Sequence, residues 1–265
     1  MKAYLALFAA IAALSFGARA AEAPAVVHNA APNQPWVKDE ALLEAAIASV
    51  HKGGLKAIGP HVPDLEAALV GARHSFELAA AGDDKSTYRL TDTPTEAMQA
   101  LMSNAAEKSA KQILTAPNPY PGIGFFLGGY YDQIGKPEQA LRVMDIALTL
   151  PGTETNSHRV DLLVERGLAL TALNRREDAL AAFDAALEIE SVAPGLRAYI
   201  YRGQGHVLDD MGRSSEGKAA YDEALKLTAN DENAKRDLDM IERLHDGGPK
   251  PPGGSPVPPK SEQPH

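Results

Sequence analysis

Apolar positions recur with helical spacing through most of this chain, and one pattern returns between Tyr120 and Thr228. When the chain is laid against itself, Gly128, Gly167 and Gly205 align, separated by 39 and then 38 residues. Each glycine is followed by a helix-breaking position and then by a second amphipathic run. A fixed period of this size, present three times, is typical of stacked repeats. We expect each unit to be two antiparallel helices that cannot bury their apolar stripes alone.

Each repeat carries the same residue types at the same offsets. The break falls at Gly135, Asn174 and Gly212, residue types that tolerate left-handed backbone at the end of a helix. A bulky apolar residue follows, and three positions beyond it an alanine precedes a leucine. The small residue of the first helix lets the second helix approach closely, and the bulky residue fills the gap between units. The predicted packing residues are Gly128, Ala140, Met144, Ala147, Gly167, Ala179, Phe183, Ala186, Gly205, Gly212, Tyr221 and Ala224.

These residues resemble tetratricopeptide repeats over residues 120–228. The tryptophan that the family carries near the start of each unit is missing, and the period exceeds the usual 34 residues. The resemblance implies a mostly α fold, an α-solenoid of three helix pairs. A further helix with an apolar stripe of Leu238, Ile241 and Leu244 is expected to cap the stack, because its other faces are charged. Repeats and cap together occupy 120–245.

The resemblance also implies that the first helix of each pair lines a concave groove that receives a peptide or a partner protein. Tyr199 and Arg202 form the one aromatic-plus-cation grouping there, which would support an extended chain and hold a carboxylate. The alternative to a binding groove is an ordinary solvent-exposed surface without a binding role. The lysines and asparagines with which chaperone-binding members grip C-terminal carboxylates are absent, so that specificity is not implied. The predicted groove residues are Phe125, Gly129, Asp132, Gln133, Asp161, Val164, Leu168, Thr171, Tyr199, Arg202, His206 and Asp209.

Residues 37–119 predict a smaller helical module of a different kind. Helical stripes at 39–54 and 63–72 precede an alternating stretch with turn chemistry at its centre, which predicts a β-hairpin at about 74–91. A capping-box spacing then opens a predicted helix at about 94–114. A lone hairpin is marginal in water, so the module should pack on the first repeat. The residues expected to be buried in the long helix are Met98, Leu101, Met102, Ala105 and Ile113.

The two ends of the chain differ from the rest. Residues 1–20 have a positive start, an apolar run and the small-x-small site Ala18-Arg19-Ala20, which predicts a secretory signal peptide and a mature N-terminus at Ala21. A flexible leader is expected over 21–36. The tail at 246–265 is so rich in proline and glycine that it predicts disorder, with a polyproline II ligand as the sharper alternative.

Composition narrows the class of partner and the compartment. Loss of Lys2 and Arg19 with the signal peptide would move the formal charge from −9 to −11, which disfavours nucleic acid. The chain has no cysteine, so it has neither disulfides nor a lipid-anchoring cysteine. No other long uncharged stretch follows the signal, so the mature protein is not expected to span a membrane. A periplasmic or secreted location is the expectation.

Candidate chemistry is sparse. The sequence contains no P-loop, GxGxxG, HExxH or GxSxG motif, and we expect no enzyme activity, cofactor or metal. His61 and His74 stand near Asp64 and Glu66, but without a recognised metal-ligand spacing. The leading hypothesis is a non-enzymatic scaffold for an unidentified protein or peptide. Two alternatives remain: a small-molecule or catalytic site in the N-terminal module around His61, His74 and Tyr88, and homo-oligomerisation through the repeat ends.

Overall fold

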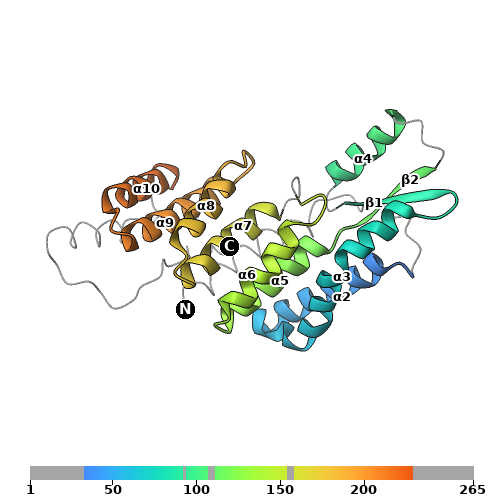
Figure 1. Ribbon diagram of the computed structural model, residues 1–265, viewed down its shortest axis with the longest axis horizontal. Helices are drawn as coiled ribbons and strands as arrows, with labels where there is room; N and C mark the ends of the chain where they lie inside the picture. The colour runs from blue at the N-terminus through green and yellow to red at the C-terminus, as the bar shows by residue number, and fades with distance from the viewer. Residues whose placement is uncertain (1–32, 92–93, 107–110, 154–157, 229–265) are drawn as a thin grey trace, which may run out of the picture.

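The computed structural model describes residues 33–91, 94–106, 111–153 and 158–228 (Figure 1). Within them the chain is mostly helical, with a single pair of strands. The elements in chain order are α2 (Pro35–Gly53), the 3-10 helix η1 (Leu55–His61), α3 (Val62–Ala81), β1 (Ser86–Thr91), α4 (Pro94–Ala106), β2 (Gln112–Pro117), α5 (Tyr120–Gln133), α6 (Pro137–Leu148), α7 (Arg159–Ala172), α8 (Arg176–Leu187), α9 (Pro194–Asp210) and α10 (Ser214–Leu227).

Three helix pairs, α5/α6, α7/α8 and α9/α10, follow one another along the long axis of the molecule (Figure 1). Each pair turns at a residue with left-handed backbone: φ is 71° at Gly135, 61° at Asn174 and 75° at Gly212. A backbone amide just after each turn bonds back into the first helix, as Lys136 does to the carbonyl of Tyr131 at 2.8 Å. The predicted α-solenoid of three helix pairs is confirmed.

Within each pair, a bulky side chain of the second helix lies directly on a glycine of the first. A Cβ added to Gly167 would stand 2.6 Å from the ring of Phe183. The same contact joins Gly128 to Met144 and Gly205 to Tyr221. Because no side chain larger than hydrogen fits at these positions, the glycines set how closely the two helices of a pair approach. Of the other predicted packing residues, five are buried, namely Ala140, Ala147, Ala179, Ala186 and Ala224. Gly212 is exposed and serves the turn instead.

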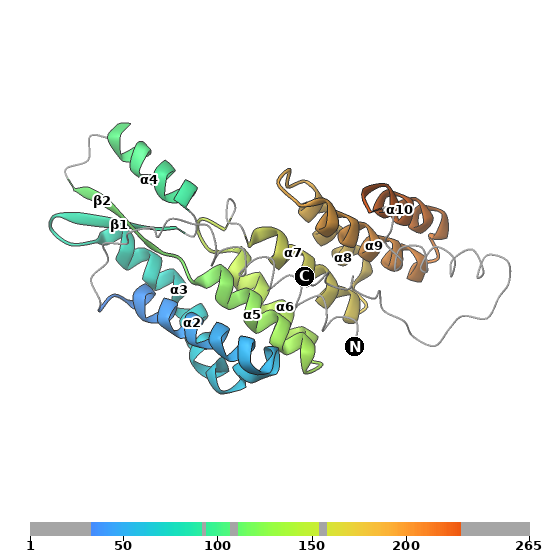
Figure 2. The ribbon, with the colours of Figure 1, turned by 180° about the vertical axis from the view of Figure 1, so that it is seen from behind.

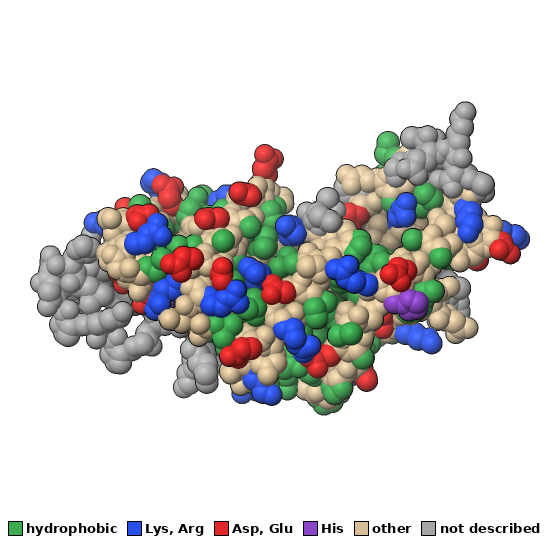
Figure 3. All heavy atoms as spheres, viewed as in Figure 1, with side chains coloured by type: hydrophobic (Ala, Val, Ile, Leu, Met, Phe, Trp, Pro, Cys, Tyr) green, Lys and Arg blue, Asp and Glu red, His purple; other side chains and the backbone are tan. Residues whose placement is uncertain are grey.

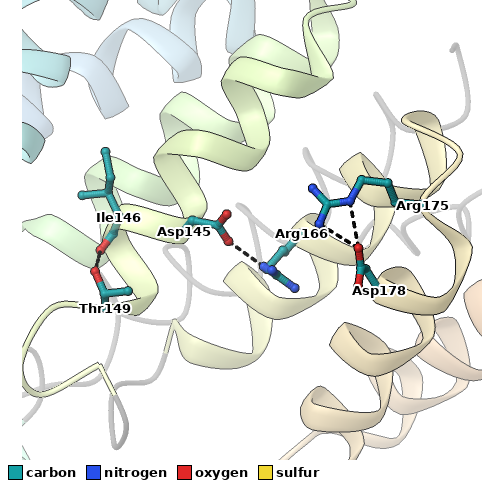
Figure 4. Close-up of polar contacts among 6 residues, drawn as sticks. All are labelled: Asp145, Ile146, Thr149, Arg166, Arg175 and Asp178. Carbon is teal, nitrogen blue, oxygen red and sulfur yellow. Dashed lines mark hydrogen bonds and ion pairs between the residues drawn. The ribbon is translucent and has the colours of Figure 1, made fainter.

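Consecutive pairs are also joined by polar contacts on the side of the solenoid drawn in Figure 4. Arg166 of α7 donates from Nε to Asp145 of α6 at 2.7 Å, which links the second pair to the first. At the start of α8, Arg175 and Asp178 form an ion pair at 2.7 Å. The Arg175–Asp178 pair is exposed and contributes less than about 1 kcal/mol, whereas the Arg166–Asp145 pair is partly buried. Figure 3 shows basic and acidic side chains interspersed over the face seen in Figure 1.

The N-terminal helices pack on the first repeat, as Figure 2 shows from behind. Tyr120, at the start of α5, donates from its hydroxyl to Asp39 of α2 at 2.9 Å, and its ring lies 5.7 Å from that of Phe76 in α3. The flexible leader was expected to extend to residue 36, but α2 already begins at Pro35. Trp36 is fully buried against Tyr88, Ala79 and Ala116, and this apolar contact fixes the first turn of α2.

The predicted β-hairpin at 74–91 is wrong. Its first arm is the continuation of α3, whose inward face runs through Leu69, Ala72, Ser75 and Ala79 at spacings of three and four. The expected alternation rested on two apolar residues, too few to separate a strand from a helix. Strand β1 pairs with β2 instead, in parallel, from Ser86↔Gln112 to Thr91↔Pro117.

The end of α3 is set by Gly82. Its φ is 61°, and an added Cβ would stand 1.8 Å from the carbonyl oxygen of Ser86, so only glycine fits the reversal into β1. Asp83 completes the turn, because its carboxylate accepts from the backbone amides of Lys85 and Ser86 at 2.8 and 2.7 Å. The turn predicted from the residues after α3 is present, but it joins a helix to a strand and not two strands.

The predicted long helix at 94–114 is also wrong in its second half. The described part of α4 ends at Ala106, and Gln112–Pro117 form β2, where Ile113 is buried. Met98, Leu101 and Met102, expected to be buried, are 59%, 43% and 67% exposed. The segment after Lys111 contains β-branched residues and pairs with β1 as a strand. The described part of α4 packs mainly on these two strands. The side chain of Ala105 lies outside the described residues.

Several predicted segments lie outside the described residues: the signal peptide at 1–20, most of the leader, the capping helix and the tail at 246–265. Within the described part of the chain, no helix is both long enough and apolar enough to cross a membrane.

Candidate functional site

The first helices α5, α7 and α9 present a common side that is not used for packing against the second helices. In α7, Arg166 contacts α6 and Gly167 contacts α8. The 3.6-residue period then turns Asp161, Glu165 and Leu168 to the opposite side of the helix. We call this side, across the three helices, the first-helix face. Its members are Gly129 and Gln133 of α5, Asp161, Glu165, Leu168 and Ala172 of α7, and Tyr199, His206 and Asp210 of α9. Phe125, Asp132 and Arg202 are three or four residues from Gly128 or Gly205 and lie closer to the side of the glycine contacts.

Two buried carboxyl groups lie on this face of α7, which packs against α5. Asp161 and Glu165 are 4% and 3% exposed, and Asp132 of α5 is close enough to Glu165 to act on its charge. Burial raises the pKa of Glu165 well above its ordinary value, and the charges of Asp132 and Asp161 raise it further. Burial alone raises the pKa of Asp132 to about 7. Loss of water therefore favours the protonated forms of Asp132 and Glu165, and the neighbouring negative charges add to this effect at Glu165.

His158, just before α7, closes one end of this acidic group. Its ring stacks on Phe125 at 6.4 Å with an interplanar angle of 18°, and its Nδ1 lies 3.7 Å from the carboxylate of Asp161. Both members of that pair are buried, so a protonated His158 would be a charged partner for Asp161. Phe125 and Val164, both predicted to line a groove, are fully buried.

On α9 the aromatic-plus-cation grouping is present, but its cation does not lie open to solvent. The guanidinium of Arg202 stacks over the ring of Tyr199 at 5.4 Å, and both side chains are buried. That Arg202 holds a carboxylate of a partner stays a prediction. His206 lies 3.8 Å from Asp210, and Asp209 accepts from Ser214 at the turn into α10.

Glu165 was missed by the sequence reasoning. The signal that could have found it is its position four residues after Asp161, which places both carboxyls on one side of a helix. Glu165 was interpreted as a solvent-facing residue, because a charged residue in an amphipathic repeat is usually exposed. Its burial depends on how α5 lies beside α7.

The residues suggested for a site in the N-terminal module do not converge. His61 lies 3.1 Å from the hydroxyl of Ser49, whereas His74 is exposed on α3 beside Glu77. Tyr88 is buried against Trp36 at 5.5 Å between ring centroids. That packed apolar contact removes the motivation for a pocket there. Among the described residues, no group of three or more His, Asp or Glu side chains is placed to hold a metal ion.

Comparison with known proteins points to the repeats. Residues 198–231 match a family model described as a tetratricopeptide repeat. No curated protein matches the chain. The fold is similar to a crystal structure of MamA, at 21% identity over 49% of this chain and 71% of that one, with a TM-score of 0.41. It is also similar to the Sgt2 TPR domain from Aspergillus fumigatus, at 20% identity over 53% of this chain and 90% of that one, with a TM-score of 0.42.

These structural likenesses are too distant to say anything about function. The sequence match covers the third helix pair, and the first two pairs repeat its glycine-on-bulky-residue contact at Gly128 and Gly167. Residues 198–231 are thus matched as a tetratricopeptide repeat, and the two preceding helix pairs repeat its packing.

Proposed function

We propose that this chain is an exported, non-enzymatic scaffold that binds a peptide or partner protein through its first-helix face. The observation that carries the proposal is the arrangement of polar groups on α5, α7 and α9. Asp161 and Glu165 lie on the side of α7 that faces away from the contact of Gly167 with Phe183. Oε1 of Glu165 is buried and has no hydrogen-bond partner among the described residues. A buried carboxyl group costs stability unless something compensates it, so its presence here supports a use for this face.

The opposite side of the repeats supports the same division of roles. There Asp145, Arg166, Arg175 and Asp178 are at least partly exposed and form local ion pairs with one another. Such pairs are ordinary surface features that leave no polar group in need of a partner. The partner is therefore assigned to the first-helix face and not to the outer surface.

Site-specific photo-crosslinking in bacterial cells tests the proposal. Ala172 of α7 is an exposed alanine on the first-helix face, and Ala181 of α8 is an exposed alanine on the outer side. Replacing Ala172 with a photoreactive amino acid should give a discrete crosslinked species, and the same replacement at Ala181 should not. Equal crosslinking from both positions, or none from Ala172, would refute a partner site on this face.

Export is supported by the sequence of residues 1–20 alone. Expression of the full chain in a bacterial host, followed by fractionation and mass measurement, checks it. The expected product lies in the periplasm or medium and begins at Ala21. A protein of full-length mass that stays in the cytosol would overturn the export part of the proposal and leave the binding part standing.

A further inference from the structure

We propose that α4 pairs with α4 of a second copy of this chain across a two-fold axis, through the exposed side chains of Met98, Leu101 and Met102. We call these three residues the α4 patch. The patch belongs to the N-terminal module and not to the first helices of the repeats. The inference is therefore independent of the proposed function, and either can fail while the other stands.

The α4 patch gathers exposed apolar side chains on one helix. Seven large hydrophobic residues are exposed in the described part of the chain, and three of them are in α4. Met98, Leu101 and Met102 are 59%, 43% and 67% exposed, and their spacings of three and four residues place them on one side of the helix. Single exposed apolar residues are ordinary, whereas a group of them marks an interaction surface. The other four are spread over the chain, at Val70, Leu78, Ile134 and Leu227.

The rest of the N-terminal module lies on only one side of α4. The strands β1 and β2 lie between α4 and the helices α2 and α3, and α4 forms an edge of the molecule in both views (Figures 1 and 2). Ala97 is buried, and the described contacts of α4 are mainly with the two strands. A sheet of two strands is close to the minimum that is stable in water, so a second helix laid on α4 would add a layer to a thin module.

The charges of α4 point to a second copy as the occupant. Near a two-fold axis each side chain meets its own copy, so a charged residue there would meet a like charge. Glu96 is the one charged residue of α4, and its Oε1 is buried. It precedes Met98 by two residues, about half a turn of the helix, and so lies away from the α4 patch. Gln99, which is exposed beside the patch, is neutral. Two copies can therefore meet here without repulsion, although the chain has a formal charge of −9.

The exposed side of α3 shows the contrast. Val70 is 65% exposed there, but Arg73, His74 and Glu77 follow it at helical spacing and are exposed as well. A copy laid on this side would remove charged side chains from water, which is costly. Among these two exposed helix sides, only that of α4 is suited to contact with its own copy.

The ends of the chain offer no better occupant for the α4 patch. Between the expected mature N-terminus at Ala21 and the start of α2, the large aliphatic residues are Val26 and Val27 alone. The chain after Thr228 continues from α10, which lies at the other end of the molecule from α4 (Figure 1). A second copy brings an apolar helix side of matching length to the patch.

The composition of the patch also sets the expected strength of the contact. Methionine is unbranched and flexible, so it fills the irregular gaps that arise when a helix meets its own copy. Three side chains from each copy make a small contact, and we expect a dissociation constant of about 10 µM or higher. Below that concentration the chain is a monomer, and Met98 and Met102 are then open to solvent.

Sedimentation equilibrium of the mature chain, residues 21–265, tests the pairing at protein concentrations from about 1 µM to about 500 µM. The mean mass should rise from that of one chain toward that of two. Met98→Glu and Met102→Glu each bring a charge close to its own copy and should weaken the dimer at least about tenfold. Val70→Glu puts the same charge on a similarly exposed position of α3 and should leave the mass curve unchanged.

Circular dichroism checks that each of these variants keeps its helices. A mass of one chain at every concentration would overturn the inference. So would a dimer that Met102→Glu leaves intact, or one that Val70→Glu weakens as much as Met102→Glu does.

A cysteine crosslink tests the position of the contact without changing the α4 patch. The chain has no cysteine, so Gln99→Cys introduces a single thiol beside the patch. At one protein concentration, a short bismaleimide should join two copies of Gln99→Cys at least about tenfold faster than two copies of Val70→Cys, because pairing holds the thiols near each other. Adding Met102→Glu to Gln99→Cys should remove this difference. Equal crosslinking rates for Gln99→Cys and Val70→Cys would show that copies of the chain do not meet at α4.

Discussion

At the scale of single residues, the fold depends on places where nothing larger than hydrogen fits. Gly167 and Gly203 both lie against Phe183, from α7 and α9, so one ring fills the space between two consecutive helix pairs. Gly71, in the middle of α3, has open space where its Cβ would be. The two kinds of glycine cannot be told apart by residue type, and their neighbours decide what a substitution does.

The first prediction compares Gly167→Ala with Gly71→Ala by urea unfolding. Alanine in place of a mid-helix glycine stabilises by about 0.5–1 kcal/mol when there is room, which is the expectation for Gly71→Ala. At Gly167 the added methyl meets the ring of Phe183, and overpacking costs about 1–3 kcal/mol. We expect Gly167→Ala to be less stable than Gly71→Ala by about 1 kcal/mol or more. Equal stability of the two variants would contradict the close contact.

The second prediction concerns pH. Burial raises the pKa of Asp132 to about 7, so between about pH 4 and 7 the folded state holds a proton that the unfolded state has lost. Stability must then fall as pH rises through this range, by up to about 1.4 kcal/mol per pH unit for this group, and Glu165 acts in the same direction. Asp132→Asn should flatten the decline and raise the melting temperature at pH 8.

Melting temperatures measured by circular dichroism from pH 5 to 8 check this expectation. Asp178→Asn, on the exposed outer side, serves as the control and should follow the wild type. A wild type whose stability rises from pH 5 to 7, or a decline that Asp132→Asn leaves intact, would show that Asp132 is not buried as the structure places it.

At the scale of elements, α4 departs furthest from what its sequence suggests. Met98 and Met102 lie outward although their spacing is that of an apolar helix stripe. The described contacts of α4 are mainly with β1 and β2, a two-stranded sheet with room for little more than one side of a helix. Met144, by contrast, is fully buried between α5 and α6.

The third prediction follows from this difference in exposure. Dilute hydrogen peroxide should oxidise Met98 and Met102 to sulfoxides well before Met144, because oxidation follows solvent access. Peptide mass spectrometry over a time course measures the order, and the same treatment in urea should bring the three rates together. Protection of Met98 and Met102 equal to that of Met144 would mean that α4 is covered in solution.

At the scale of the whole molecule, each helix pair is stabilised by its contacts with the neighbouring pairs. In repeat proteins such contacts supply much of the stability, so the loss of one contact destabilises both of the repeats that share it. Phe183 makes a shared contact of this kind, since it lies against α7 in its own pair and against α9 in the next. The N-terminal helices meet only the first repeat closely, through contacts such as Tyr120 with Asp39.

The fourth prediction is that Phe183→Ala weakens α7 through α10 together. Truncation of a buried phenylalanine costs about 3–5 kcal/mol. Hydrogen exchange with mass spectrometry should show the largest loss of protection in α7–α10 and a smaller loss in α2 and α3. Asp145→Ala, which removes only the exposed pair with Arg166, is the control and should change protection little. A loss of protection in Phe183→Ala that is confined to α8 would contradict the shared packing contact.

The repeats were predictable because their signal is local and is given three times. Gly135, Asn174 and Gly212 mark the turns, and the glycines and bulky residues recur at fixed distances from them. The N-terminal module gave no such repetition. The segment His74–Ala81 has too few apolar residues to distinguish period two from period 3.6, and the strand at Gln112–Pro117 needs a partner 26 residues earlier in the chain.

The candidate site was predictable only in part. Helical periodicity places Asp161 and Glu165 on one side of α7, away from Gly167. The burial of these two carboxyls, the stacking of Arg202 on Tyr199 and the effect of Asp132 on Glu165 could not be read from any one helix. These features depend on how neighbouring first helices lie beside one another.

The sequence by itself determined the helix pairs, their turns and the glycines at which the two helices of a pair come into contact. Each of these features depends on residues that are near one another in the chain. Only the tertiary structure decided the partner of the strand β1, the exposure of α4 and the effect of Asp132 and Asp161 on the pKa of Glu165. The physical reason is that pairing, burial and the pKa of a carboxyl depend on groups brought close in space, which the order of residues along the chain does not specify.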